Sequence, residues 1–170
     1  AAIVDNKLKI KLVHIEAGIR SYNSEMVEEI NRILTDRISN VLFCPTSLAL
    51  KNLEKEGFLN YNCDILNTGD VMLDSVLLFN KILLKPKVNL PERFIICTIH
   101  RPENTDDINI LKNIFEGLEE ISNDEKIILP LHPRTKKILD DNNFTFHKNI
   151  IAIEPVSYLE MLWLLNNCLM

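Results

Sequence analysis

The chain has 170 residues, of which 46% are hydrophobic and 25% are charged, and its formal net charge is −5. These values are typical of an ordinary globular protein with one good core or two small ones. The acidic balance and the lack of a basic cluster count against nucleic acid as a partner. No apolar run approaches the ~20 residues that a membrane span needs, so we expect no membrane association and a cytoplasmic protein.

Cysteine usage agrees with that expectation. The chain has four cysteines, and none of them forms a C-x-x-C pair. Cys44 and Cys97 lie inside apolar runs, which favours buried reduced thiols over metal ligands. Reduced thiols are typical of a cytosolic protein.

Strand and helix patterns alternate through the first half of the chain. Short apolar runs predict strands at residues 9–13, 41–44 and 64–66. Periodicity and capping residues predict helices at about residues 25–39, 47–56 and 72–84. Ser24 is expected to cap the first of these helices, and Thr46 or Ser47 the second. The segment Lys85–Pro91, bracketed by two prolines, is the predicted linker.

The same alternation restarts after the linker. Strands are predicted at residues 94–98, 126–131 and 149–153. Helices are predicted at about residues 106–122, 134–140 and 157–166, with Asn104 or Thr105 capping the first of them. Strands this apolar, separated by helices, are typical of parallel sheets covered on both faces. We therefore predict an α/β fold with the back of one doubly wound domain at residues 1–85 and the front of a second at 86–170.

Both ends of the sequence look interrupted. Residues 1–4 resemble the middle of a helix, and residues 168–170 resemble the start of a new strand. We therefore expect an internal fragment of a longer protein, with further site residues outside it.

Two strings of ionisable residues open where an apolar strand ends, at His14–Arg20 and at His100–Asn104. Ligands of open α/β sheets bind beyond the carboxyl ends of the strands. Glu16 lies at such an end, and the small residues that follow it permit the close approach of a ligand. The alternative is that Glu16 caps a neighbouring helix.

Glu28 and Glu29 fall in the first turn of the next predicted helix. A functional carboxylate is one interpretation, and a simple complement to the helix dipole is the other. Glu28 and Arg32 are also i,i+4 neighbours, and such a pair forms a surface ion pair in many helices.

His100 and Arg101 precede a predicted helix N-terminus, which is a suitable place for phosphate. The alternative is a solvated loop in which Glu103 pairs with Arg101. His132 and Arg134 repeat the arrangement one strand later, where a capping turn is the alternative interpretation.

Several familiar catalytic motifs do not occur in the sequence. It contains no G-x-G-x-x-G string, no Walker loop, no G-x-S-x-G string and no metal-ligand spacing. Dehydrogenases, P-loop enzymes, serine hydrolases and zinc enzymes are therefore disfavoured.

Seven short strings occur in a fixed order along nearly the whole chain: His14–Arg20, Glu28–Asp36, Cys44–Thr46, Thr68–Asp74, His100–Asn104, His132–Pro133 and Glu154–Leu159. In sequence and order they resemble the motifs of the non-hydrolysing UDP-N-acetylglucosamine 2-epimerases. Val27 departs from the pattern, because the family usually has proline there. The family's N-terminal phosphate-gripping segment, its H-G-D-T string and its D-S-G-G-x-Q-E-E string have no counterpart in these 170 residues.

The resemblance implies two Rossmann-like parallel-sheet domains of the glycosyltransferase-B type, both incomplete here. It also implies the interconversion of UDP-GlcNAc and UDP-ManNAc by elimination of UDP and its re-addition through 2-acetamidoglucal. The implied reaction serves surface polysaccharide synthesis and requires no cofactor and no metal. The complete protein is expected to be a homodimer, and these 170 residues alone are expected to be inactive.

The resemblance also implies roles for individual residues. Glu16 and Glu28 match catalytic carboxylates, and His100 matches a group that contacts the diphosphate. Val156 and Met161 match positions that line a uracil pocket. The expected substrate-binding residues are Arg20, Arg32, Arg101, Glu103, Asn104, His132, Val156 and Met161.

Three alternatives remain open. One is an epimerase for another UDP-2-acetamido sugar, such as a diacetamido uronic acid. Another is a hydrolysing relative that releases ManNAc. The third belongs to a different class: a non-catalytic nucleotide-sugar-binding module.

Overall fold

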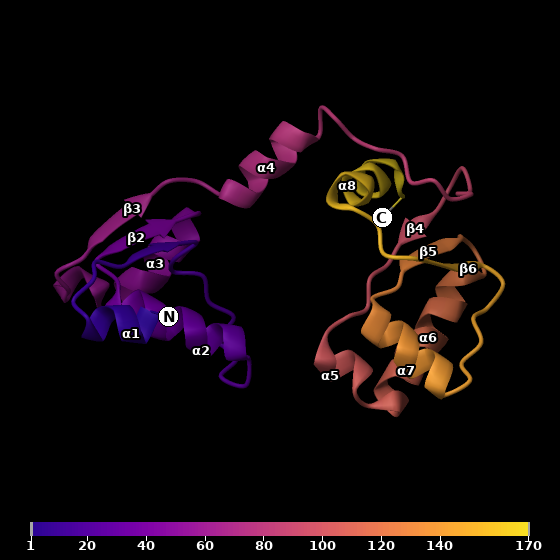
Figure 1. Ribbon diagram of the computed structural model, residues 1–170, viewed down its shortest axis with the longest axis horizontal. Helices are drawn as coiled ribbons and strands as arrows, with labels where there is room; N and C mark the ends of the chain where they lie inside the picture. The colour runs from indigo at the N-terminus through magenta and orange to yellow at the C-terminus, as the bar shows by residue number, and fades with distance from the viewer. Residues whose placement is uncertain (1, 170) are drawn as a thin grey trace. The chain divides into compact units, whose positions relative to one another are not determined.

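The computed structural model describes residues 2–169 of the chain, which divides into two compact units, Ala1–Ser75 and Val76–Met170 (Figure 1). Each unit holds its own three-stranded sheet. The domain boundary that we predict at residue 85 stays a prediction.

The first unit alternates helices with the strands of one parallel sheet. Its elements are α1 (Ala2–Lys7), β1 (Val13–Ile15), α2 (Val27–Ile38), β2 (Val41–Cys44), α3 (Ser47–Lys55), the 3-10 helix η1 (Phe58–Asn60), β3 (Asp64–Asn67) and the start of α4 (Val71–Phe79). The strands are parallel in the order β1-β2-β3, with Val41 opposite both Val13 and Asp64. Leu42, Leu53 and Phe58 are fully buried at its core.

The second unit repeats this arrangement. After the end of α4 it contains β4 (Ile95–Ile96), α5 (Pro102–Thr105), α6 (Ile108–Ser122), β5 (Ile127–Pro130), α7 (Pro133–Asp141), β6 (Ile150–Ile153) and α8 (Tyr158–Asn167). The strands are parallel in the order β4-β5-β6. The prediction of parallel sheets joined by helices is therefore confirmed in both units.

The central strand β5 shows why this second sheet is covered on both faces. Ile127 and Leu129 pack in one core cluster with residues of α6 and α7, whereas Ile128 packs in another with Leu164 of α8. This is the alternation that the period of two in a strand requires. All four residues of β5 are buried as a result.

Several predicted element ends are wrong. The first strand begins at Val13 rather than residue 9, because α1 continues to Lys7 and Lys9 is left-handed, with φ of +58°. Ser24 does not cap α2, whose N-cap is Met26 without a side-chain bond. Helix α4 ends at Phe79 rather than residue 84.

The helix after β4 also differs from its prediction. A separate single turn, α5, starts at Pro102, and α6 is capped by Asp107, whose side chain accepts from the backbone N–H of Asn109. Thr105 is therefore no cap, and its hydroxyl donates to the carbonyl of Arg101 at 3.1 Å. By contrast, the predicted cap of α3 by Thr46 is confirmed, and Gly57, with φ of +80°, follows the end of that helix.

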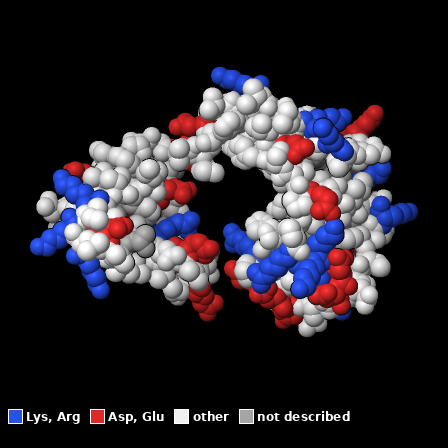
Figure 2. Space-filling model, in the orientation of Figure 1, with Lys and Arg blue, Asp and Glu red and all other residues white. Residues whose placement is uncertain are grey.

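Acidic and basic side chains alternate over the visible surface, and no large area of a single sign stands out (Figure 2). Across residues 2–169, no helix combines the length and the apolar character needed to cross a membrane. The same residues contain no group of three or more His, Cys, Asp or Glu side chains placed to hold a metal ion.

Candidate active site

A cavity of about 180 Å³ opens at the carboxyl ends of the three strands of the first unit. Each strand end contributes to its wall, which consists of Ile15, Glu16, Phe43, Pro45, Thr68, Gly69, Val71 and Asp74. Glu16 therefore lies where open α/β sheets bind their ligands. Asp74, on α4, adds a second carboxylate to the same wall.

Glu16 adopts an unusual backbone conformation. Its φ is +74°, in the left-handed region that costs a non-glycine residue about 1–3 kcal/mol. The turn that follows is held tightly, because the N–H of Ala17 donates to the carbonyl of Phe43 in β2 at 3.0 Å. Gly18 is also left-handed, with φ of +75°, and a Cβ there would lie 2.5 Å from the carbonyl oxygen of Ala49.

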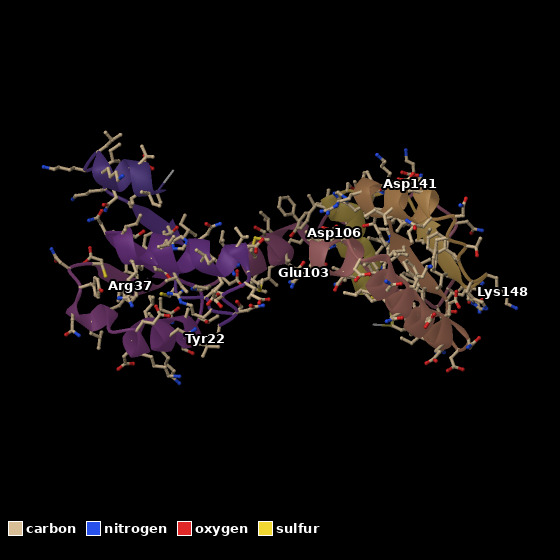
Figure 3. All side chains as sticks on the ribbon, turned by 90° about the horizontal axis from the view of Figure 1, so that it is seen from below. Tyr22, Arg37, Glu103, Asp106, Asp141 and Lys148 are labelled. Atoms are coloured by element: carbon tan, nitrogen blue, oxygen red, sulfur yellow. The ribbon has the colours of Figure 1, made fainter. Side chains whose placement is uncertain are left out.

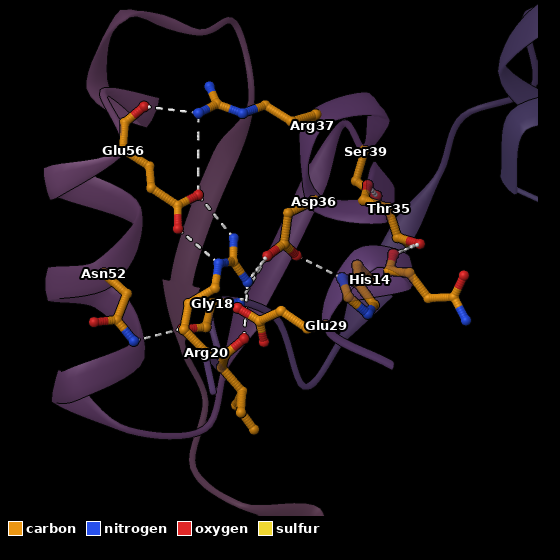
Figure 4. A network of polar contacts seen from close by, with 12 residues as sticks. His14, Gly18, Arg20, Glu29, Thr35, Asp36, Arg37, Ser39, Asn52 and Glu56 are labelled. Atoms are coloured by element: carbon orange, nitrogen blue, oxygen red, sulfur yellow. Dashed lines mark hydrogen bonds and ion pairs between the residues drawn. The ribbon is translucent and has the colours of Figure 1, made fainter. Parts of the chain in front are cut away.

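Buried charges surround this turn (Figure 4). The carboxylate of Asp36, on α2, accepts from the N–H of Gly18 at 3.1 Å and from Nη1 of Arg20 at 2.8 Å. Nδ1 of His14 lies 2.6 Å from the same carboxylate. Arg20 also donates to Glu56 through Nε at 2.6 Å and Nη2 at 2.9 Å.

Arg20 lies within this group of buried charges. Its side chain is 1% exposed and is shared between two carboxylates. Burial lowers its pKa, but the hydrogen bonds and charges of Glu56 and Asp36 outweigh burial, so the net direction is upward. Arg20 therefore helps to hold the loop, and its direct contact with substrate stays a prediction.

The two neighbouring glutamates at the start of α2 differ in exposure. Glu28 is exposed, and within the described residues no ion pair joins it to Arg32, which is half-buried. Glu29 is 2% exposed, and it accepts from the N–H and hydroxyl of Ser21 and from the N–H of Tyr22. Burial raises the pKa of Glu29, but these hydrogen bonds and the charge of Arg20 lower it overall.

In the second unit, His100 and Arg101 lie in the exposed loop between β4 and α5. The segment from Ile99 to Asp106, which includes this loop and α5, is tied to α7 at two points. The buried hydroxyl of Thr135 donates to the carbonyl of Ile99 at 3.0 Å, and Arg134 pairs with Asp106. The first contact holds the backbone next to His100 and the second lies beyond α5, and the side chain of His100 is exposed.

Other predicted ligands of the second unit lie close to helix ends. His132 caps α7, and its Nδ1 accepts from the N–H of Arg134 at 3.3 Å, as the alternative interpretation expects. Glu103 is exposed and Asn104 half-buried on α5, near Asp106 (Figure 3). Within residues 2–169, no ion pair joins Glu103 to Arg101.

Val156 and Met161 flank the start of α8. Both are half-buried, and Val156 packs against the core cluster that contains Ile128 and Leu164. Ser157 caps the helix in a capping box with Glu160. The structure therefore holds these two apolar side chains on a rigid helix start.

None of the predicted site residues lines a second cavity, which lies in the second unit. It measures about 380 Å³, and its wall consists of Val88, Leu131, Lys136, Leu139, Asp140, Phe146, Ala152, Ile153 and Glu154. Lys136 and Glu154 on its wall form an ion pair at 2.5 Å. We do not assign it to the active site.

Sequence reasoning assigned no role in holding the Glu16 turn to three buried polar residues, Glu29, Asp36 and Asn52. Each is less than 5% exposed. A signal was present for Asn52, a polar residue among the buried positions of α3, next to Leu53 and one turn after Ala49. Buried polar groups need partners, so such a position indicates a specific hydrogen bond.

Residues 1–170 match the family model described as UDP-N-acetylglucosamine 2-epimerase. The chain is 47% identical, over 96% of its length, to a UDP-2,3-diacetamido-2,3-dideoxy-D-glucuronate 2-epimerase of Pseudomonas aeruginosa. It is 43% identical, over 98% of its length, to a UDP-N-acetylglucosamine 2-epimerase of Methanocaldococcus jannaschii. The chain spans about half the length of these curated relatives, 46% of the first and 49% of the second.

Solved structures agree with the sequence relatives. The UDP-GlcNAc 2-epimerase of Methanocaldococcus jannaschii in complex with UDP-GlcNAc and UDP is matched at a TM-score of 0.80 and 41% identity, over 98% of this chain and 49% of that one. The UDP-GlcNAc 2-epimerase of Neisseria meningitidis bound to UDP-GlcNAc is matched at a TM-score of 0.80 and 30% identity, over 99% of this chain and 49% of that one. These likenesses confirm the predicted fold of two incomplete Rossmann-like domains of the glycosyltransferase-B type. The chain therefore belongs to the UDP-N-acetylglucosamine 2-epimerase family.

Proposed function

We propose that this chain forms part of an enzyme that interconverts UDP-GlcNAc and UDP-ManNAc. The observation that carries the proposal is Glu16, which a held left-handed turn places in the wall of the cavity at the strand ends. A carboxylate fixed in such a place suits proton transfer at a sugar carbon. Family membership and the nucleotide-sugar complexes of the neighbours support the same assignment.

The chemistry requires carboxylates of this kind. The proton at C2 of the sugar is weakly acidic, so a base must be held against it while negative charge develops on the departing diphosphate. Reprotonation from the opposite face of the 2-acetamidoglucal intermediate requires an acid there, and re-addition of UDP completes the inversion. We assign these proton transfers to Glu16 and Glu28.

In this proposal the second unit supplies groups that bind the diphosphate and the uracil ring. We assign the leaving diphosphate to His100 and Arg101, because both are exposed where β4 ends. Val156 and Met161 offer apolar surface for uracil at the start of α8. Arg32, Glu103, Asn104 and His132 remain proposed substrate contacts. We further propose that the complete enzyme is a cytoplasmic homodimer that serves surface polysaccharide synthesis.

A second substrate is favoured by one specific observation. The relative that is 47% identical to this chain is named for a UDP-diacetamido-glucuronate. That sugar differs from the one in UDP-GlcNAc by a further acetamido group and a carboxylate. The same C2 chemistry applies to both sugars, so Glu16 and Glu28 keep their roles under either assignment.

The test uses the purified protein that carries this chain. It is incubated in D₂O with UDP-GlcNAc and, separately, with UDP-2,3-diacetamido-2,3-dideoxy-glucuronate, and the products are followed by NMR. We expect the 2-epimer of UDP-GlcNAc, with deuterium at C2. Free ManNAc plus UDP would instead indicate a hydrolysing enzyme, and turnover of the uronate alone would favour the second substrate.

Two controls accompany this assay. Glu16→Gln in the same protein should abolish most of the deuterium incorporation. The 170 residues expressed alone are expected to show no turnover, because they span about half the length of the relatives. Nucleotide-sugar binding without turnover or exchange in the whole protein would favour a non-catalytic binding module.

A further inference from the structure

The loop that carries Glu16 contains an unusual number of left-handed residues. Glu16, Gly18 and Tyr22 have φ of +74°, +75° and +57°. Two of the three are not glycine, and a strained conformation of this kind persists only where the surroundings enforce it. We call residues 16–22 the Glu16 loop.

Two buried side chains hold the central glycine of the Glu16 loop from opposite sides. The N–H of Gly18 donates to Asp36 on α2 at 3.1 Å, and Nδ2 of Asn52 on α3 donates to the carbonyl of Gly18 at 3.0 Å. Asn52 also accepts from the hydroxyl of Tyr22 at 2.9 Å. One peptide segment is therefore fastened to two different helices, two residues beyond Glu16.

Burying the polar side chains of Asp36 and Asn52 costs free energy of folding. Asp36 is 1% exposed and Asn52 is 4% exposed. A buried charge or amide costs several kcal/mol unless it is fully paired, and a well-packed apolar residue of similar size is often no less stable. Asp36 is paired with Arg20 and His14, and Asn52 is hydrogen-bonded to the Glu16 loop itself. Their contacts converge on the segment that presents Glu16 to the cavity.

We propose that Asp36 and Asn52 are positioning residues, which hold the Glu16 loop so that the Glu16 carboxylate is fixed against C2 of the sugar. This inference rests on the proposed function. Neither side chain lines the cavity, so neither is a catalytic residue. A shift of about 1 Å in the reacting geometry can cost 10²-fold in rate, so loosening this loop should slow the chemistry and leave nucleotide binding intact.

The test compares Asn52→Ala and Asp36→Asn with the unaltered protein that carries this chain. Calorimetry with UDP counts the folded binding sites, and turnover of UDP-GlcNAc and deuterium exchange at C2 are expressed per site. We expect kcat per site to fall about 10- to 100-fold in Asn52→Ala, in step with the exchange rate, and KM and the Kd for UDP to change less than about 3-fold. A third variant, Asp36→Ala, should lose more kcat per site than Asp36→Asn, because the amide oxygen of asparagine can still accept from the N–H of Gly18.

Phe58→Leu is the matched control. Phe58 is 1% exposed in the same core as Ala17 and Leu53, but it makes no hydrogen bond to the Glu16 loop. A loss of stability alone should therefore reduce the number of UDP sites in Phe58→Leu and leave turnover per site unchanged.

The outcomes separate the two proposals. Full kcat and full C2 exchange per site in Asn52→Ala would overturn the positioning role. If Asp36→Asn does not fold, Asn52→Ala decides alone, because it removes no charge. If the unaltered protein neither epimerises nor exchanges at C2 with either sugar, the proposed function itself has failed, whatever the variants do.

Discussion

Glu28 and Glu29 are neighbours in the first turn of α2, yet one is exposed to solvent and the other is buried against the Glu16 loop. Adjacent residues on a helix point about 100° apart, so a single turn presents one carboxylate outward and one inward. The exposed carboxylate is available for chemistry. The buried one accepts three hydrogen bonds from Ser21 and Tyr22.

The first prediction concerns the two carboxylates assigned to proton transfer. In the protein that carries this chain, Glu16→Gln and Glu28→Gln should each lower kcat by at least ~10²-fold, the usual scale for a positioned acid or base. Both side chains are exposed, so thermal melting should change little. Near-normal turnover in either variant would return that residue to its alternative interpretation, a helix cap or a helix-dipole complement.

The alternation of elements was predictable because strands and helices have different apolar periods. It correctly indicated parallel sheets, the strand at Val41–Cys44 and the cap at Thr46. The ends of elements were harder to predict. Met26 rather than Ser24 is the N-cap of α2, and the loop before it is held by a hydrogen bond from Ser21 to Glu29, a contact that local pattern does not contain.

The second prediction concerns the phosphate end of the site. His100→Ala should weaken UDP binding and slow cleavage of the bond between the sugar and the diphosphate, because His100 lies exposed beside Arg101 where β4 ends. Calorimetry with UDP and the rate of epimerisation measure the two effects. Lys148→Ala, at an exposed position just before β6, is the control and should alter neither. Unchanged affinity for UDP together with unchanged turnover in His100→Ala would show that His100 does not contact the diphosphate.

The third prediction concerns pH and Glu29. The pKa of its carboxyl is lower in the folded chain than the ordinary value of 4.5, so its ionised form stabilises the fold. That contribution is fully present above the ordinary pKa and is lost as the pH falls through the folded pKa. Glu29→Gln should therefore destabilise the protein by about 1–3 kcal/mol at pH 7, and the difference should shrink as the pH falls below the ordinary pKa of 4.5.

Urea unfolding at several pH values measures this difference. The matched control is Glu28→Gln, one residue away on the same turn but exposed, which should change the free energy of unfolding by no more than about 0.5 kcal/mol. Equal effects of the two substitutions at pH 7 would show that the hydrogen bonds of Glu29 contribute nothing particular.

The site was only partly predictable for a related reason. Strings of ionisable residues at strand ends indicated Glu16 and His100 as candidates, because parallel strands present their carboxyl ends at one edge. The same reasoning grouped Arg20 with the ligands, although the structure pairs it with Asp36 and Glu56. Whether an arginine faces a ligand or a buried carboxylate depends on residues far along the chain, which a local motif does not reveal.

The last prediction tests how tightly the Glu16 loop is packed. Gly18→Ala should destabilise the protein by at least about 2 kcal/mol, because it combines a left-handed φ of +75° with a Cβ placed 2.5 Å from the backbone oxygen of Ala49. Gly57→Ala is the matched control, since its φ is +80° and no atom lies within 4 Å of the added Cβ. It should lose only the ~1–2 kcal/mol of the backbone conformation.

The folded fraction of Gly18→Ala should also turn over more slowly per UDP site, because the loop must move to admit the methyl group. Equal losses of stability in the two alanine variants, with normal turnover in both, would mean that α3 shifts at little cost to admit the added methyl group. The Glu16 loop would then not be held as tightly as its contacts indicate.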